Sequence, residues 1–222
     1  FRISDHDAVL VDLDLNAPPT VDAGGPYLVR KGEYVTLMAT ATDPNHDPLT
    51  FERDLDNDGI FETPGMHVDY FAAEGPGFFS VSVRATDDGG LSDVDSAEVI
   101  VYDPDAGFVT AGGWIDSPAG ALAFDPDAAG KANFGLEVQY KDGEQSPRGN
   151  LEFDFKKGDL NFKAQAFEWL VVFPDGLQAQ MMGSGTINGS GHYFFRLWVS
   201  DADTDTFRLM IWQGQGAGMQ LV

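Results

Sequence analysis

The sequence contains no cysteine. This absence excludes disulfides, cysteine nucleophiles and cysteine-ligated zinc, and it leaves the compartment undecided because disulfide-free secreted proteins are common in bacteria. Long apolar runs are missing too, and none approaches the roughly 20 residues that a membrane-spanning helix needs. The chain begins at Phe1 with neither a methionine nor a signal peptide, so we expect a fragment or a processed product.

Basic residues are scarce. Only 13 Lys and Arg stand against 36 Asp and Glu, which gives a net charge of -23 and a pI near 4.1. This charge repels polyphosphates and argues against sequence-independent binding of nucleic acid. It favours a secreted protein that binds divalent cations or works in salty surroundings. Hydrophobic residues make up 43% of the chain, with 17 Phe and 4 Trp, so a sizeable core is expected rather than disorder.

Helical periodicity is absent, and short runs of alternating apolar residues dominate the chain. Turn-forming clusters such as Glu74-Gly75-Pro76-Gly77 and Asp87-Asp88-Gly89-Gly90 separate these runs. We predict an all-β protein with two tandem antiparallel β-sandwich domains at 17–103 and 104–222, the second jelly-roll-like, after an N-terminal orphan strand at 1–16. The alternating runs are 34–41, 78–85, 97–102, 151–155, 169–173, 193–199 and 207–212.

The most specific metal-binding pattern in the sequence is the acidic turn at residues 54–62. Asp54, Asp56 and Asp58 place carboxylates at alternate positions, and Gly59 follows for the tight turn. The backbone carbonyl of Ile60 can then join them around Ca²⁺. The twelfth position of an EF-hand loop would fall on Gly65, which has no carboxylate, so this is not an EF-hand. The alternative is an acidic hairpin turn that holds no metal.

A family resemblance covers residues 17–103. The segments 17–26 and 41–51, the acidic turn and the segment 83–90 occur in the order found in PKD domains. The resemblance implies an immunoglobulin-like sandwich that serves as a spacer or adhesion module on extracellular proteins. Arg53 replaces the aromatic residue usual in the family before the acidic turn, which weakens the case for carbohydrate stacking on that face. We expect His46 and His67 to be surface loop residues.

Most of residues 106–213 resembles the bacterial module called post-COAP. This resemblance implies a β-rich appendage of secreted bacterial proteins and carries over no activity. Asp201, Asp203 and Asp205 form a second alternating acidic set, for which we favour a solvated loop because no glycine follows. The matching segments are 107–115, 130–135, 158–162, 183–191 and 207–212.

The four tryptophans of the second half, Trp114, Trp169, Trp198 and Trp212, allow two interpretations. They form a sugar-binding platform if their rings are exposed in one row, and they belong to the core if they are buried, which is the commoner case for tryptophan in strands.

The segment 4–13 resembles the closing motif of type I deoxyribonuclease-like endonuclease/exonuclease/phosphatase enzymes. The resemblance implies that His6 would contact a scissile phosphate and that Asp5 would orient it. Phosphodiester chemistry also needs a positioned metal and nucleophile, which this motif alone does not supply. We therefore predict that the chain has no catalytic residues and that Asp5 and His6 are vestigial.

An alternating apolar face continues from this motif through Val9, Val11, Leu13 and Leu15. A strand of this kind needs a partner for its backbone and for its apolar face. It can add to its own sheet or to another chain, and head-to-tail addition would build an open filament.

These patterns favour a non-catalytic, calcium-stabilised structural or adhesion module that is secreted or held at the cell surface. Its expected partners are other copies of itself or extracellular matrix, with no nucleic acid and no membrane span. One alternative is the accessory region of a secreted nuclease, which the Asp5-His6 pair favours. A second is a carbohydrate-binding module. Glu152, Asp154 and Glu168 could mimic a glycosidase pair, but solvent-facing strand positions are the commoner explanation.

Overall fold

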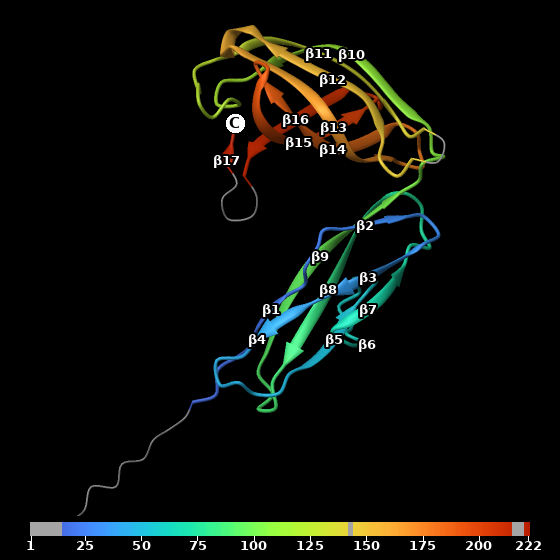
Figure 1. Cartoon of the computed structure of the whole chain (residues 1–222), viewed down its shortest axis with the longest axis vertical. Helices are drawn as coiled ribbons and strands as arrows, with labels where there is room; N and C mark the ends of the chain where they lie inside the picture. Colours follow the sequence, from blue (N-terminus) through green and yellow to red (C-terminus); the bar gives the residue numbers. More distant parts are fainter. Residues whose placement is uncertain (1–14, 142–143, 215–219) are drawn as a thin grey trace, which may run out of the picture. The chain divides into compact units, whose positions relative to one another are not determined.

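The computed structural model describes residues 15–141, 144–214 and 220–222, and Figure 1 shows their arrangement as a ribbon. The chain is all-β, as predicted, and its described residues include one short 3-10 turn, η1 (Lys156–Gly158), and no α-helix. None of these residues belongs to a helix long and apolar enough to cross a bilayer. The predictions for Asp5, His6, Val9, Val11 and Leu13 lie outside the described residues.

The chain divides into two compact units, described separately below. The first unit comprises the residues up to Gly25, Thr36–Val68 and Ser80–Ala97, and the second comprises Pro26–Val35, Asp69–Phe79 and Glu98–Val222. The domain boundaries at 16/17 and 103/104 remain a prediction.

Residues 20–102 form three small sheets. One pair departs from the antiparallel expectation, because β2 (Tyr27–Arg30) runs parallel to β9 (Ser92–Tyr102), with Tyr27 opposite Val99. Positive φ angles of 74° at Gly24 and 84° at Gly25 precede β2, and a side chain would disfavour that backbone. The sheets are β1 (Thr20–Asp22) with β4 (Thr40–Thr42), β3 (Tyr34–Met38) with β7 (His67–Phe71), and a five-stranded sheet ordered β2 (Tyr27–Arg30), β9 (Ser92–Tyr102), β8 (Gly77–Thr86), β5 (Thr50–Asp54), β6 (Thr63–Pro64).

The first unit has a core of small aliphatic side chains. Alternation along β8 buries Val81, Val83 and Ala85 completely, and Leu37 of β3 is buried as well. These side chains supply little apolar area each, so the unit depends on polar interactions more than a core rich in large residues would.

The second unit contains one eight-stranded antiparallel sheet in which each strand pairs with its successor along the chain. This order differs from the jelly-roll-like arrangement expected from the sequence, and the sheet curls on itself (Figure 1). The tightest connection is a two-residue turn. Asn188 and Gly189 join β14 (Gln178–Ile187) to β15 (Ser190–Ser200) with φ angles of 51° and 74°, typical of a tight hairpin turn. The strands are β10 (Phe108–Ser117), β11 (Gly130–Gln139), β12 (Arg148–Phe155), β13 (Leu160–Val172), β14 (Gln178–Ile187), β15 (Ser190–Ser200), β16 (Thr206–Gln213) and β17 (Gln220–Leu221).

Leucine and phenylalanine supply most of the large buried side chains of this unit. Phe195 is fully buried, and its ring centroid lies 5.4 Å from that of Phe162 and 5.7 Å from that of Phe167. Gly183 lets β14 lie close to the irregular part of β13, because a Cβ at this position would collide with the Ala166 carbonyl. The glycine and the aromatic cluster therefore shape the same part of the sheet.

Candidate functional site

The acidic turn begins where β5 ends, at Asp54. The Asp54 carboxylate accepts hydrogen bonds from the backbone N–H of Asp58 at 3.2 Å and of Gly59 at 2.8 Å. The N–H of Ile60 donates to Asp58 Oδ1 at 2.7 Å. Positive φ angles at Asn57 (59°) and Gly59 (89°) turn the chain sharply enough for these bonds to form.

The turn brings the three predicted carboxylates together. One oxygen each from Asp54, Asp56 and Asp58 lies within 4.8 Å of the other two. Asp54 is only 2% exposed, whereas Asp56 and Asp58 face solvent. Two exposed carboxylates and one buried one form a half-open cradle of hard oxygen donors, the ligand type that Ca²⁺ prefers. A contribution from the Ile60 carbonyl remains a prediction.

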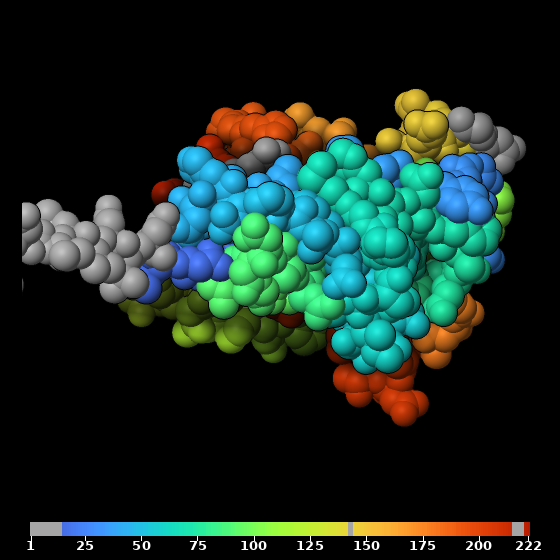
Figure 2. Space-filling model, turned by 90° about the horizontal axis from the view of Figure 1, so that it is seen from below, coloured from blue at the N-terminus to red at the C-terminus, as the bar shows by residue number. Residues whose placement is uncertain are grey.

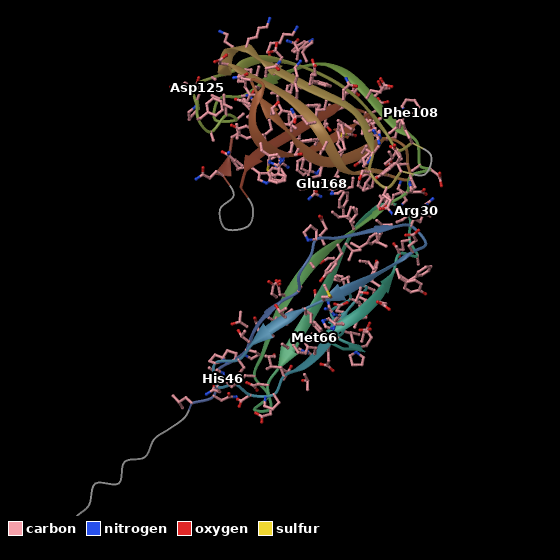
Figure 3. All side chains as sticks on the ribbon, in the orientation of Figure 1. Arg30, His46, Met66, Phe108, Asp125 and Glu168 are labelled. Atoms are coloured by element: carbon pink, nitrogen blue, oxygen red, sulfur yellow. The ribbon has the colours of Figure 1, made fainter. Side chains whose placement is uncertain are left out.

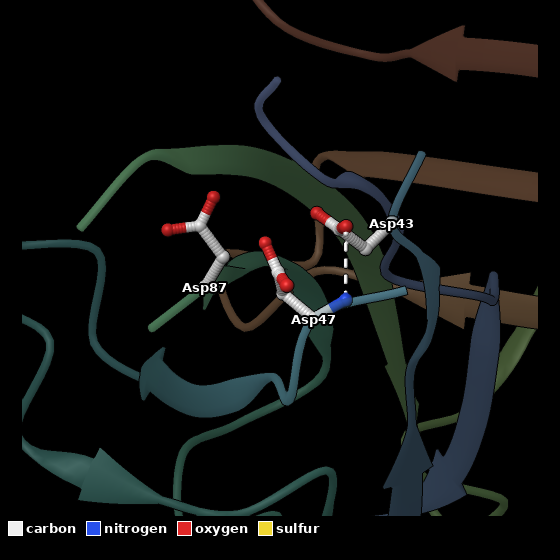
Figure 4. Close-up of side chains that lie close together, drawn as sticks. All are labelled: Asp43, Asp47 and Asp87. Carbon is white, nitrogen blue, oxygen red and sulfur yellow. Dashed lines mark hydrogen bonds between the residues drawn. The ribbon is translucent and has the colours of Figure 1, made fainter. Parts of the chain in front are cut away.

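A second acidic cluster lies elsewhere in the first unit. Asp43 and Asp47 belong to the loop after β4, and Asp87 follows β8. One oxygen from each lies within 4.8 Å of the other two, and the three side chains point toward one another (Figure 4). The sequence pattern marked these segments only as turns and as parts of the PKD-like motifs. Two of the three aspartates are largely buried, which the pattern did not indicate.

The loops that carry this second cluster also hold the segment Leu15–Ala17. Asn45 Oδ1 accepts a hydrogen bond from the Ala17 N–H at 2.9 Å, and Asn45 Nδ2 donates to the Leu15 carbonyl at 3.4 Å. Asn16 Nδ2 donates to Asp87 Oδ2 at 3.0 Å. In Figure 2 the dark blue start of the described chain, the light blue loop and the green loop lie side by side at one end of this unit.

Leu15 is the one described member of the predicted assembly strand. It lies outside the strands, and its side chain is 77% exposed. His46 is exposed, as expected, and its Nδ1 lies 3.1 Å from the Asp43 carbonyl (Figure 3). His67 is exposed too, but it is the first residue of β7 and not the loop residue that the sequence had led us to expect.

Arg53 lies in the core rather than on a binding face. Its side chain is fully buried, and Nη2 donates to the Met66 carbonyl at 2.8 Å. A buried guanidinium at this position offers no surface for sugar stacking, which agrees with the absence of the usual aromatic residue.

The other acidic candidates lie in the second unit. Asp201, Asp203 and Asp205 are exposed and do not converge as the two clusters of the first unit do. Glu152 forms an exposed ion pair with Lys163 at 2.9 Å, and Glu168 is exposed. These placements fit the solvated-surface interpretation.

The four tryptophans do not form an exposed row. Trp114 of β10 is 57% exposed, whereas Trp169 and Trp212 are 3% and 8% exposed. Trp114 borders a groove of about 640 Å³ between β10 and the ends of β14, β15 and β16. Phe108, at the start of β10, is 64% exposed (Figure 3). Polar residues of the groove wall are Thr110, Gln178, Ser200, Asp201, Asp205 and Thr206.

No protein-family model matches the chain, and no curated protein matches it. The PKD, post-COAP and nuclease resemblances therefore remain predictions. Among solved structures, one similar chain is described as "Structural basis for the promiscuous specificity of the carbohydrate-binding modules from the beta-sandwich super family". It is 15% identical, with 89% of this chain and 84% of that chain covered and a TM-score of 0.34. A TM-score this low does not define a shared topology.

Proposed function

We propose that this chain is a non-catalytic extracellular module whose first unit is stabilised by Ca²⁺ bound at the Asp54–Gly59 turn. The observation that carries the proposal is the convergence of the Asp54, Asp56 and Asp58 carboxylates on one point. Three carboxylates at such distances repel one another unless a cation or protons neutralise them. Extracellular modules bind Ca²⁺ with dissociation constants of roughly 10⁻⁴–10⁻³ M, which suits an open site of few ligands.

Thermal unfolding with Ca²⁺ and with a chelator tests this proposal. A ligand that binds only the folded state raises the free energy of unfolding by about 2.7 kcal/mol at 100 times its dissociation constant. We expect Ca²⁺ to raise the midpoint of the first unit, and Asp56→Asn to reduce this rise by the share that the Asp54–Gly59 turn contributes. Asp56 is the best target because it is exposed, and no backbone hydrogen bond of the turn depends on it.

The matched control is Asp88→Asn, an exposed aspartate of the same unit outside both clusters. It removes the same charge without touching the turn, so its response to Ca²⁺ should equal that of the wild type. An unchanged midpoint of the wild-type protein on chelation would remove calcium from the function.

Carbohydrate binding is the second candidate function. The supporting observation is Trp114, a half-exposed ring with Lys131 Nζ 4.9 Å from its centroid, beside a groove whose wall carries hydroxyl, amide and carboxylate groups. Sugars stack on such rings and hydrogen-bond to such groups. Affinity electrophoresis against soluble polysaccharides should show retardation that Trp114→Ala removes and Phe124→Ala keeps. Phe124 is 60% exposed and does not line the groove, so equal loss in both variants would reject this site.

Filament formation through residues 1–15 and attachment to a nuclease remain predictions. Electron microscopy and light scattering on the full chain, beside a variant that lacks residues 1–15, test the first of these. Filaments that vanish on deletion would identify this segment as the assembly strand, whereas compact monomers in both samples would reject self-assembly.

A further inference from the structure

The second acidic cluster contains a buried carboxylate oxygen without a hydrogen-bond partner. Asp43 is 9% exposed, and its Oδ2 is buried and accepts no hydrogen bond. Its Oδ1 accepts two, from the N–H of Asn45 at 2.8 Å and of Asp47 at 3.1 Å. One oxygen of Asp43 therefore fixes the loop while the other is directed at the neighbouring carboxylates (Figure 4). Buried polar atoms almost always have a partner, so this oxygen indicates a ligand.

The surroundings of this oxygen are anionic. Asp47 and Asp87 each place an oxygen within 4.8 Å of the Asp43 carboxylate, and Asp87 is only 5% exposed. Asp87 Oδ1 accepts from the Leu91 N–H at 2.8 Å, and its Oδ2 accepts from Asn16 Nδ2. Low-dielectric surroundings strengthen the repulsion between such carboxylates, and a divalent cation would relieve it. All three offered ligands are hard oxygens, which favours Ca²⁺ over softer metals.

We propose that Asp43, Asp47 and Asp87 form a second Ca²⁺ site, separate from the Asp54 turn, and that its occupancy fixes the segment Leu15–Ala17 on the first unit. The coupling runs through the same side chains and loops. Asp43 Oδ1 accepts a hydrogen bond from the Asn45 N–H, and the Asn45 side chain is hydrogen-bonded to Ala17 and Leu15. On the other loop, Asp87 accepts a hydrogen bond from the Asn16 side chain. A cation that holds the two loops together would therefore also hold the segment Leu15–Ala17.

Calorimetric titration of the full chain with Ca²⁺, after removal of bound metal, measures the number of sites. We expect Asp43→Asn and Asp47→Asn each to bind one equivalent fewer than the wild type. Asp56→Asn should lose a different equivalent, so the double variant Asp43→Asn with Asp56→Asn should lose both. Asp88→Asn is again the matched control, because it removes a charge beside Asp87 and should bind as many equivalents as the wild type.

Asparagine at position 43 keeps an oxygen for the Asn45 and Asp47 N–H groups, so the loop should still form. In chelator, Asp43→Asn should melt at or above the wild-type temperature because it removes one of the repelling charges. If this variant nevertheless fails to fold, Asp47→Asn tests the site instead. Asp47 is half-exposed, and its carboxylate does not accept the two backbone hydrogen bonds that Asp43 Oδ1 accepts. Loss of an equivalent in a variant that stays folded in chelator supports the site.

Hydrogen exchange tests the coupling to the segment Leu15–Ala17. Pro18 and Pro19 have no amide hydrogen, so the Ala17 amide is the last exchangeable one before Thr20. Ca²⁺ should slow exchange at Ala17 in the wild type and in Asp56→Asn, and should leave it unchanged in Asp43→Asn. The proposal is overturned if Asp43→Asn and Asp47→Asn bind as much Ca²⁺ as the wild type, or if Ca²⁺ does not alter exchange at Ala17. A failure of the Asp54 site alone would show instead as normal binding by Asp56→Asn.

Discussion

The two units bury different kinds of side chain. Within the described residues, every buried charged side chain belongs to the first unit: Asp43, Arg53, Asp54 and Asp87. In the second unit the described buried side chains are apolar or aromatic, with Phe155, Phe162 and Phe195 among the largest. Burial of charge makes stability depend on cations and on hydrogen-bond partners, whereas apolar burial does not. The first unit should therefore respond to its ionic surroundings, and the second should be nearly indifferent to them.

The position of the tryptophans makes this comparison measurable. All four, Trp114, Trp169, Trp198 and Trp212, lie in the second unit, and the first unit has none. Tryptophan emission therefore follows unfolding of the second unit alone, and calorimetry follows both. Two transitions have to be analysed separately, because a single unfolding free energy has no meaning for a chain that unfolds in parts.

The largest effect should come from the phenylalanine core. Phe195→Ala removes a fully buried ring that packs against Phe162 and Phe167. Truncation of a buried phenylalanine costs about 3–5 kcal/mol, and the loss should be the same in Ca²⁺ and in chelator. Denaturant unfolding followed by tryptophan emission measures it. A loss that depends on Ca²⁺ would break the distinction between the units.

Asp54→Ala should have the next largest effect, and in the first unit. It removes the acceptor for the Asp58 and Gly59 N–H groups, which costs about 1–3 kcal/mol in chelator, where bound metal makes no contribution. In Ca²⁺ the loss should be larger, because the variant also lacks a ligand. Calorimetry in both buffers gives the two values, while the tryptophan-reported transition should stay in place. Equal losses in both buffers would assign Asp54 a purely structural role.

Tyr140 offers a smaller test, on the second unit and by pH. Burial raises the pKa of the Tyr140 hydroxyl well above its usual value, and the oxygen accepts a hydrogen bond from the Leu170 N–H at 3.0 Å. The folded state holds the Tyr140 proton more tightly than the unfolded state, in which the hydroxyl has its usual pKa near 10. The contribution of the neutral hydroxyl to stability is therefore complete below about pH 10 and is lost as the pH rises further. Tyr140→Phe should destabilise by ~1–2 kcal/mol at neutral pH by leaving that N–H without a partner.

The pH dependence separates this explanation from simple loss of packing. Between pH 7 and pH 9 the difference in stability between Tyr140→Phe and the wild type should be constant. Above about pH 10 it should shrink, since only the wild type must keep a buried phenol neutral. A difference that stays constant across the whole range would show that ionisation of Tyr140 is not linked to folding.

The two acidic clusters show how far sequence reasoning reaches. Asp54, Asp56 and Asp58 could be predicted as one group because the ligands lie within five residues and Gly59 marks the turn. The second cluster could not, because Asp87 lies 40 residues from Asp47, and only the pairing of the strands between them brings the loops together. Charge at position 43 was visible in the sequence, but the burial of that charge is a property of the fold.

The strands show the same limit. Each alternating run overlaps an observed strand, for example the buried alternation of Val81, Val83 and Ala85 on β8, but several long strands, among them β10, β11 and β14, lie outside the runs. Alternation did not predict which strands pair, since the same alternation fits a two-sheet jelly roll and a single curled sheet. The two-residue turn at Asn188-Gly189 fixes the pairing of β14 with β15, whereas the longer connections of the eight-stranded sheet leave the pairing of the other strands open.

The smallest predicted effect compares one surface ion pair in each unit. Glu52 lies directly opposite Arg84 on β5 and β8, and Glu152 lies directly opposite Lys163 on β12 and β13. The first pair has a charged contact of 2.6 Å and a guanidinium 4.5 Å from the centroid of the Phe61 ring, whereas the second has a contact of 2.9 Å. Both pairs are half-exposed, so neither should contribute more than about 1 kcal/mol.

Double-mutant cycles to alanine should give a coupling near 0.5–1 kcal/mol for Arg84 with Glu52, and about 0.2–0.5 kcal/mol for Lys163 with Glu152. The coupling is larger for Arg84 because its planar guanidinium can bond to the Glu52 carboxylate while its face lies over the Phe61 ring. The ammonium group of a lysine cannot make both contacts. Arg84→Lys should therefore lose most of the extra coupling even though the charge is kept.

At 1 M salt the coupling of Lys163 with Glu152 should fall to nothing measurable, while part of the coupling of Arg84 with Glu52 persists, because contact with a ring is screened less than an exposed charge pair. If the two ion pairs instead have the same coupling energy, both at low salt and at 1 M salt, the two units differ in their buried groups and not on their surfaces.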